Sequence, residues 1–318
     1  MDLLSDLLSQ LQLTGTLYFR TSFTSPWSIQ VPAYAQVARF HFAYRGRCLI
    51  RIQTDQPSVL LDQGDLIVIT RGASHTLFCD PTTEGLAVQL DEVVAKSGFN
   101  GHGALVYGEP GTHHETQLIC GHFAFDTEIR HPLLDGLPNY IHIANYGQSA
   151  GSWMEGTLKI IGSEAGRANL GSDLIALKLS EIIFAQALRT YIESEANIAG
   201  HLAGFADPVI CKALHAIHDA PGHPWTLQTL ASTAGVSRTL LANRFTRSLN
   251  ITPLGYVTQW RMQLARKELL TTSRSIIDIA ETVGYHSEAA FGRVFKKFFA
   301  KGPATYRREQ SLVSIEGA

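Results

Sequence analysis

The chain carries the segment IIDIAETVGYHSEAAFGRVFKKFFAKGPATYRR at residues 276–308, and a related segment begins with LASTAGVS at residues 230–237. After each turn sequence the two segments share apolar residues at aligned positions, and each ends on a proline followed by a tyrosine. The aligned apolar pairs are Leu241 with Phe291 and Phe245 with Phe295. This internal repeat predicts two copies of one helical supersecondary unit.

Each copy has the features of a helix-turn-helix. A small alanine lets the first helix approach the second, and Gly235 or Gly284 supplies the left-handed backbone that ends the first helix. Ser237 and Ser287 are expected to cap the second helices by accepting hydrogen bonds from exposed amides. One such pattern is a weak signal, but two copies joined by an amphipathic helix over Leu254–Leu270 are specific.

The region from Pro208 to about Arg308 resembles the AraC/XylS transcription regulators, and the match is most specific at residues 276–308. The resemblance implies seven helices, with two recognition helices that enter successive major grooves of double-stranded DNA. It also implies an activator of transcription that has RNA polymerase as a further partner.

Candidate DNA contacts lie on the exposed face of each predicted recognition helix: Arg238, Thr239, Asn243 and Arg247, then Glu288, Ala289, Arg293, Lys296 and Lys297. Arg293 and Asn243 occupy the same position of the repeat. An arginine there favours guanine and an asparagine favours adenine. Arg247, Lys296 and Lys297 are expected on phosphates, which set affinity without reading sequence. The alternative for each residue is an ordinary solvated side chain.

Charge is distributed unevenly along the 318 residues. From residue 207 onward, 14 Lys and Arg stand against 8 Asp and Glu, whereas the preceding residues hold 12 against 20. A basic C-terminal third behind an acidic body favours two domains with different tasks.

The bulk composition is that of a folded protein. Hydrophobic residues make up 45% and charged residues 17%, which excludes an intrinsically disordered chain. No apolar run approaches the roughly 20 residues that a membrane span needs. The first residues lack the features of a signal peptide, so a cytoplasmic protein is expected, with reduced cysteines.

Residues from 15 to about 126 predict closely spaced strands without intervening helices, which is typical of a β-barrel or sandwich. The Gly- and His-rich stretch Asp91–His114 is expected to be a loop or insertion. Helices are expected from about 131 to 195. The helix Ser172–Ser194 has more apolar surface than one barrel contact requires, and this predicts a homodimer.

The strand region also contains motifs that resemble a cupin. Residues 64–75, GDLIVITRGASH, resemble the second cupin motif with Thr70 in place of the usual proline, and residues 40–46 retain one histidine, His41, of the first. Together with the C-terminal region, this resembles a subgroup of AraC-like regulators that includes a reactive-chlorine-responsive member.

The predicted fold class is α+β multidomain, with a cupin-like β-barrel and helices over residues 1–195, a linker over 196–206 and an all-α domain with two helix-turn-helix units over 207–318. For the barrel, an effector pocket with His41, His75 and Cys120 is expected. A zinc site stays open, with His41 and His75 as candidate ligands and with Cys79, Cys120, His113, His114 or His122 to complete the set. A purely structural, dimer-forming role also stays open. A cupin-type metal-dependent enzyme with an accessory helical domain is the alternative function, although two histidines and a carboxylate at the required spacing are not found.

Overall fold

The computed structural model describes residues 5, 8, 13–35, 37–52, 56–101, 103–108, 114–125, 137–146, 156–157, 160, 170–193 and 207–316. The chain forms two compact units, one built from the strands with one long helix and the other from the helices beyond residue 207. The expected linker at 196–206 lies outside the described residues, and so does most of the range 131–170, where helices were expected. The expectation is wrong for Tyr140–Ile143, which forms a strand that pairs with Leu66–Ile69. Within the described part, no helix is both long and apolar enough to cross a bilayer.

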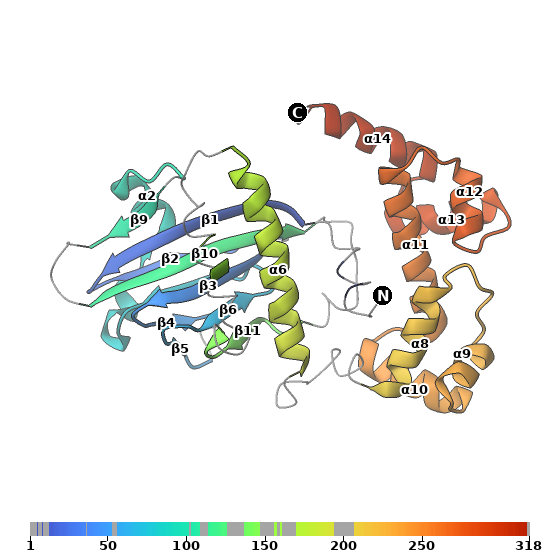
Figure 1. The fold of residues 1–318 in the computed structure, drawn as a ribbon, viewed down its shortest axis with the longest axis horizontal. Helices are drawn as coiled ribbons and strands as arrows, with labels where there is room; N and C mark the ends of the chain where they lie inside the picture. Colours follow the sequence, from blue (N-terminus) through green and yellow to red (C-terminus); the bar gives the residue numbers. More distant parts are fainter. Residues whose placement is uncertain are drawn as a thin grey trace. The chain divides into compact units, whose positions relative to one another are not determined.

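The first unit contains two sheets that face each other (Figure 1). The six-stranded sheet has the order β11-β6-β3-β10-β1-β9 and the five-stranded sheet the order β5-β4-β7-β2-β8. The strands are β1 Leu13–Thr24, β2 Ser28–Val31, β3 Val37–Arg45, β4 Cys48–Arg51, β5 Val59–Leu61, β6 Leu66–Ile69, β7 His75–Phe78, β8 Val88–Gln89, β9 Ala104–Tyr107, β10 Glu115–Phe125 and β11 Tyr140–Ile143. A short 3-10 helix, η1, spans Pro81–Leu86.

The core of this unit lies between the sheets. Alternate residues of each strand point inward, and the buried set includes Trp27, Ile50 and Leu118. β3 and β10 run antiparallel in a register that sets His41 directly opposite Cys120. His75 begins β7 of the other sheet, so this fold brings the three predicted pocket residues to one side of the interior.

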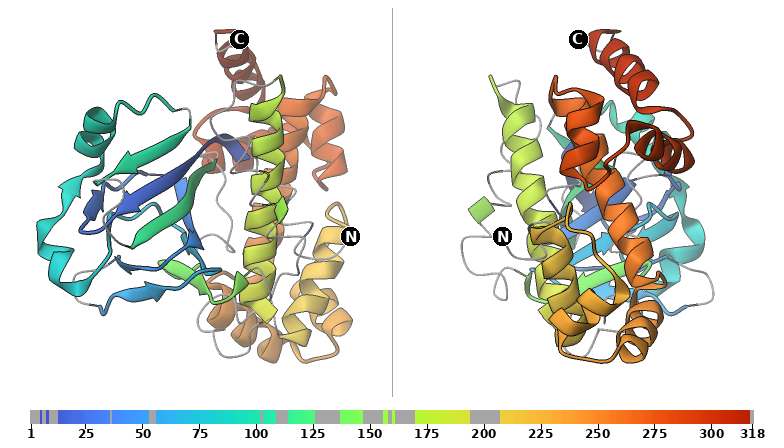
Figure 2. Two further views of the ribbon diagram at one scale, coloured as in Figure 1. Left: turned by 60° about the vertical axis from the view of Figure 1, so that its left-hand side comes forward. Right: turned by 90° about the vertical axis from the view of Figure 1, so that its right-hand side faces the viewer.

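Helix α6, Ser172–Glu193, packs against β1 and β11 of the six-stranded sheet (Figure 1, Figure 2). Its inner face buries Ile183, Phe184, Ala187 and Leu188, and the ring of Phe184 lies 5.3 Å from that of Phe123 on β10. The predicted helix Ser172–Ser194 is therefore confirmed.

The expectation that Asp91–His114 is a loop or insertion is wrong for residues 91–97 and 104–107, which have regular structure. Helix α2 spans Leu90–Ser97, and β9 pairs in parallel with β1. The segment gives a weak sequence signal because α2 buries only Val93 completely and β9 is a short edge strand of four residues. Its regular structure depends on strands from elsewhere in the chain.

The second unit contains seven described helices, the number that the AraC/XylS resemblance implies. They are α8 Pro208–Asp219, α9 Leu227–Ala234, α10 Arg238–Leu249, α11 Pro253–Thr271, α12 Ile276–Thr282, α13 Glu288–Phe299 and α14 Pro303–Glu316. Helices α9 and α10 form the first helix-turn-helix, α12 and α13 form the second, and α11 connects them.

The predicted helix ends are confirmed. Ser237 accepts a hydrogen bond from the amide of Leu240, and Ser287 accepts one from the amide of Ala290. Gly235 has φ +73° and Gly284 φ +83°, a backbone conformation that side chains with a Cβ rarely adopt.

The tyrosines that end each repeat are buried, and each hydroxyl meets a buried polar side chain. The Tyr256 hydroxyl lies 2.8 Å from Nε2 of His218. The Tyr306 hydroxyl accepts a hydrogen bond of 2.6 Å from Nε of Arg266.

Candidate functional site

Helices α10 and α13 each have a buried apolar face and an exposed polar face. Leu241, Phe245 and Leu249 anchor α10, and Phe291, Phe295 and Phe299 anchor α13. Because 3.6 residues make one helical turn, positions midway between two anchors lie on the opposite side. Asn243 and Arg293 occupy these positions and are exposed.

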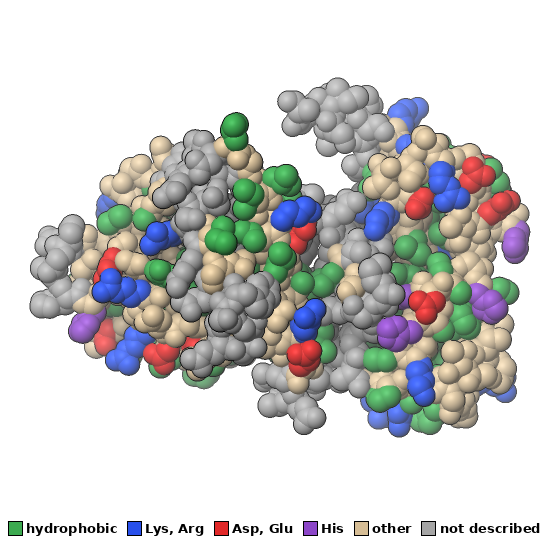
Figure 3. All heavy atoms as spheres, viewed as in Figure 1, with side chains coloured by type: hydrophobic (Ala, Val, Ile, Leu, Met, Phe, Trp, Pro, Cys, Tyr) green, Lys and Arg blue, Asp and Glu red, His purple; other side chains and the backbone are tan. Residues whose placement is uncertain are grey.

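The structure leaves all nine predicted contact residues exposed: Arg238, Thr239, Asn243, Arg247, Glu288, Ala289, Arg293, Lys296 and Lys297. Arg244, which also lies on α10, instead forms an ion pair of 3.4 Å with Asp207. Among the described contacts, none of the five Lys and Arg candidates forms an ion pair. Figure 3 shows Lys and Arg side chains on the visible face of the helical unit. The exposed amides at each helix start, next to Ser237 and Ser287, add further anion-binding groups.

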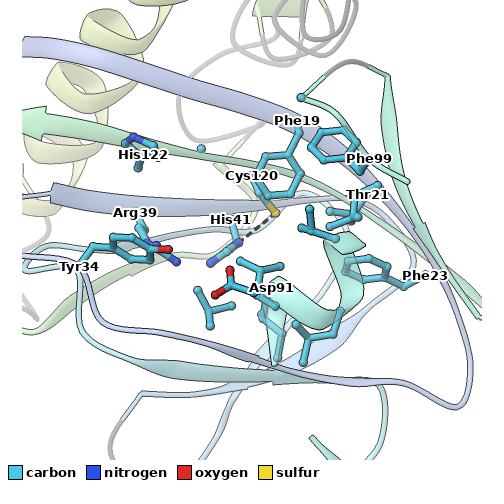
Figure 4. A pocket seen from close by; sticks show the side chains of 18 of the residues that line it. Phe19, Thr21, Phe23, Tyr34, Arg39, His41, Asp91, Phe99, Cys120 and His122 are labelled. Carbon is cyan, nitrogen blue, oxygen red and sulfur yellow. Dashed lines mark hydrogen bonds between the residues drawn. The ribbon is translucent and has the colours of Figure 1, made fainter. Parts of the chain in front are cut away.

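A cavity of about 450 Å³ opens inside the first unit (Figure 4). Its walls are mainly apolar and come from β1, β2, β3, β7, β9, β10, α2 and the turn after α2. The polar side chains that line it include Arg39, His41, Asp91, Cys120 and His122. A mostly apolar cavity with a few polar groups is typical of a small-molecule site.

His41 lies at the centre of a buried hydrogen-bonded chain. Its Nδ1 is 3.0 Å from Sγ of Cys120, and its Nε2 is 2.9 Å from Nε2 of His75. Nδ1 of His75 lies 2.9 Å from the carbonyl oxygen of Ala73. Since a carbonyl only accepts, His75 donates from Nδ1 and accepts at Nε2, so His41 donates from Nε2 and the Cys120 thiol donates to Nδ1.

Burial keeps this chain uncharged. Desolvation lowers the pKa of His41 well below its usual value, and it lowers the pKa of His75 to about 4. Burial likewise raises the pKa of the Cys120 thiol. A protonated thiol is a poor nucleophile and a poor metal ligand.

The cupin likeness raises the question of a metal. Cys120 and His75 contact different nitrogens of the His41 ring. The sulfur of Cys120 and the ring nitrogens of the two histidines therefore do not point toward one common position that a metal ion could occupy. Within the described residues, no three His, Cys, Asp or Glu side chains are grouped as a metal site requires. The residues present fit the hydrogen-bonded chain better than a zinc ion.

Two of the three predicted pocket residues line the cavity. His41 and Cys120 do so, whereas His75 lies behind His41 and is not part of the lining. The sequence reasoning also missed Arg39 and the α2 residues Leu90, Asp91 and Val94. The only sequence signal for Arg39 is a cation in a strand that is otherwise mostly apolar. His113, a further candidate ligand, lies outside the described residues.

Comparisons with known proteins cover both units. The sequence model of a family described as Cupin matches residues 2–193, and that of a family described as Helix-turn-helix domain matches residues 230–309. An AraC-like transcription regulator of Streptomyces antibioticus is 33% identical over 97% of this chain and 99% of that protein. The HTH-type transcriptional regulator AlkR of Acinetobacter baylyi is 29% identical over 97% of this chain and 100% of its own.

A third relative covers part of the chain. The RCS-specific HTH-type transcriptional activator RclR of Escherichia coli is 28% identical over 60% of this chain and 68% of its own length. The Cupin match ends where α6 ends, and the helix-turn-helix match begins within α9.

Proposed function

The chain belongs to the AraC-like transcription regulators with an N-terminal cupin domain, and from this membership we propose that it activates transcription by binding one DNA site through α10 and α13 in response to a small molecule in its cupin cavity. The observation that carries the proposal is the pair of helix-turn-helix motifs with exposed cations that form no ion pair among the described contacts. RNA polymerase is the further partner in this proposal, and the cytoplasm is the location.

The two recognition helices divide the contacts by side-chain chemistry. Arg293 forms paired hydrogen bonds with a guanine, and Asn243 forms them with an adenine at the equivalent place of the first unit. Arg238, Thr239, Glu288 and Ala289 lie within the first turn of their helices, next to the base edges. Arg247, Lys296 and Lys297 lie toward the helix ends and bind phosphates.

The cupin domain acts as a sensor in this proposal, with residues 1–195 as the sensor, 196–206 as the linker and 207–318 as the DNA-binding domain. A mostly apolar cavity with a few polar groups supports an effector role. A metal-dependent enzyme is disfavoured because Cys120 and His75 contact different nitrogens of His41.

Helix α6 provides the dimer contact in this proposal. Its outer face exposes Leu174 at 61% and Ile182 at 41%, together with Ile175. Figure 3 shows hydrophobic side chains gathered over one end of this helix. These side chains form an apolar stripe that is interrupted by Lys178, which pairs with Glu181. Exposed apolar side chains grouped on one face are typical of a protein contact. A second copy of the chain is the simplest occupant, because two copies present the same stripe to each other.

The proposal is tested by sequencing the DNA that the protein retrieves from its own genome. The expected result is one recurring motif, bound more tightly than a shuffled duplex of equal composition and with an affinity that falls steeply with salt. Equal affinity for motif and shuffled DNA at every salt concentration contradicts a sequence-specific regulator.

A further inference from the structure

Arg39 lies on the inner wall of the cavity, and one of the hydrogen-bond donors of its charged guanidinium has no partner among the described residues. It lies on β3 between the buried residues Ala38 and Phe40, and Figure 4 shows it beside Tyr34. Its guanidinium carbon lies 4.2 Å from the centre of the Tyr34 ring. Its Nε is buried and has no hydrogen-bond partner in the described part of the chain.

An unsatisfied buried donor on a charged group is costly, and an arginine does not escape the cost by losing its proton. Burial lowers the pKa of Arg39, but the guanidinium remains charged at neutral pH. Arg39 is the one Lys or Arg among the described residues that line the cavity. The cavity therefore holds a fixed positive charge with donor capacity to spare.

Among the other polar groups of the lining, the Tyr34 side chain takes one hydrogen bond from the guanidinium, but Nε of Arg39 keeps no partner among the described residues. Both nitrogens of His41 are engaged, by Cys120 and by His75. Asp91 is the acidic residue among the described lining, but it is exposed and forms no ion pair with Arg39 among the described contacts. Water screens an exposed carboxylate far more than a half-buried guanidinium. The electrostatic potential inside the cavity is therefore positive near Arg39.

The remaining lining is apolar. Phe19 and Phe23 of β1 and Phe99 from the turn after α2 line the part of the cavity away from Arg39 (Figure 4). Leu105 and Val94 also line the cavity. These walls offer an aliphatic or aromatic body a dry surface, but they offer almost no polar atoms.

We propose that the cavity binds a small apolar carboxylate, with its head group on the guanidinium of Arg39 and its apolar body against the phenylalanine walls. The inference rests on the proposed function, because this ligand is the effector whose chemical class was left open there. Carboxylate oxygens accept paired hydrogen bonds from a guanidinium, and these bonds are stronger than those between neutral groups.

Three probes that share one alkyl chain test the head group: octanoate, octanol and octylamine. Each is titrated into the full-length protein, without DNA, and binding is followed by calorimetry. Octanoate is expected to bind about tenfold or more tightly than the other two, since a hydrogen bond to a charged partner stabilises more than a neutral one. Equal binding of all three, or a preference for octylamine, overturns the proposal.

Three substitutions test whether the charge of Arg39 is the one that binds the head group. Arg39→Met keeps a flexible apolar side chain but removes the cation, and it is expected to abolish the preference for octanoate over octanol. Asp91→Asn is the matched control in the same cavity, and it is expected to leave octanoate binding unchanged or slightly tighter. Arg39→Lys, which restores the charge, is expected to recover part of the preference. If Arg39→Met keeps the preference while its melting temperature is unchanged, the assignment of Arg39 is wrong.

Two independent measurements distinguish the failure of this inference from the failure of the proposed function. Binding of octanoate is measured without DNA, and DNA affinity is measured without octanoate. If the motif is bound specifically but octanoate shows no dependence on Arg39, the ligand class is wrong and the regulator stands. If octanoate binds through Arg39 but no DNA site is bound, the proposed class of ligand is correct and the proposed regulatory function is wrong.

Discussion

Gly222 and Gly284 approach so closely that a Cβ on Gly284 would lie 2.7 Å from the carbonyl oxygen of Gly222. Gly222 belongs to the loop between α8 and α9, and Gly284 is the turn glycine of the second helix-turn-helix. Arg261 of α11 completes this contact, because its Nε and Nη2 donate 2.7 Å hydrogen bonds to the carbonyls of Pro221 and His223. Within the helical unit, this contact therefore joins the second helix-turn-helix to the loop that precedes the first, in addition to the connection through α11.

The first prediction is that this contact fixes the spacing of the two recognition helices. Arg261→Met removes both hydrogen bonds while it keeps an apolar stem. Binding to DNA with both half-sites is expected to weaken by about 1–3 kcal/mol, the order of two lost hydrogen bonds of a charged group. Binding to DNA with one half-site scrambled is expected to change little. Fluorescence anisotropy on both duplexes measures the difference.

Gly284→Ala is a second variant at the same contact, and Gly235→Ala is its control, because Gly235 also has a left-handed backbone (φ +73°) but a Cβ there meets nothing within 4 Å. Both variants carry backbone strain, and Gly284→Ala is expected to reduce full-site binding more than Gly235→Ala does. Equal losses on intact and scrambled duplexes for Arg261→Met would show that the contact stabilises folding without setting the spacing.

The second prediction concerns pH and the first unit. The pKa of His75 is about 4 in the folded state and that of His41 is also lowered, against 6.5 for an unperturbed histidine. The unfolded chain therefore binds more protons than the folded chain between about pH 6.5 and about pH 4, and stability falls as pH falls through this window. The loss is on the order of 1 kcal/mol per pH unit for each histidine.

Calorimetric unfolding of the full chain between about pH 7.5 and about pH 5 checks this sign. The transition of the strand unit should move to lower temperature, and the control variant His75→Gln should show a smaller shift. A wild-type transition that is independent of pH would mean that His41 and His75 are not held neutral by burial.

The third prediction concerns self-association through α6. Ile182→Glu places a charge within the exposed apolar stripe and is expected to convert the dimer to a monomer at micromolar concentration, as measured by light scattering. Leu86→Glu is the control, because Leu86 is an exposed apolar side chain of the same unit that lies in η1 and not on α6. A wild-type chain that has a monomer mass with and without DNA contradicts the dimer.

Local sequence patterns were sufficient to predict the helices and turns of the helical unit, but they were not sufficient to predict which residues line the cavity. The repeat places Ser237, Gly235 and the anchor Phe245 within one short segment, so their roles follow from spacing alone. His41 and Cys120 are 79 residues apart and meet through the register of β3 and β10. Sequence patterns do not specify which residues of two distant strands lie opposite each other. For the same reason, neither Arg39 nor α2 could be assigned to the cavity in advance.

The fourth prediction concerns the autonomy of the helical unit. Residues 206–318 contain their own buried core, which includes Met262, Phe291 and Tyr306, together with capped helices and the net positive charge. This fragment is expected to be helical by circular dichroism and to bind the same DNA motif more weakly than the full chain. A folded fragment without DNA affinity at low salt would contradict the assignment of DNA binding to this unit.

The last prediction concerns how α13 divides its work between bases and backbone. Arg293 is six residues beyond the N-cap Ser287 and lies opposite the buried anchors Phe291 and Phe295. It is exposed, as Lys297 is, and neither forms an ion pair among the described contacts. A helix that lies in the major groove presents this face to base edges, whereas its last turn lies nearer the phosphates. The two cations are therefore expected to differ in what they recognise, although they lie on the same helix.

Arg293→Ala is expected to cost about 1–3 kcal/mol on the specific motif and to relax the preference at one guanine. Lys297→Ala is expected to weaken specific and random DNA by similar factors and to reduce the slope of log affinity against log salt by about one. The comparison controls for folding, because a misfolded domain loses both kinds of DNA in both variants. If Arg293→Ala lowers specific and random binding by the same factor, Arg293 contacts a phosphate and the reading face of α13 lies elsewhere.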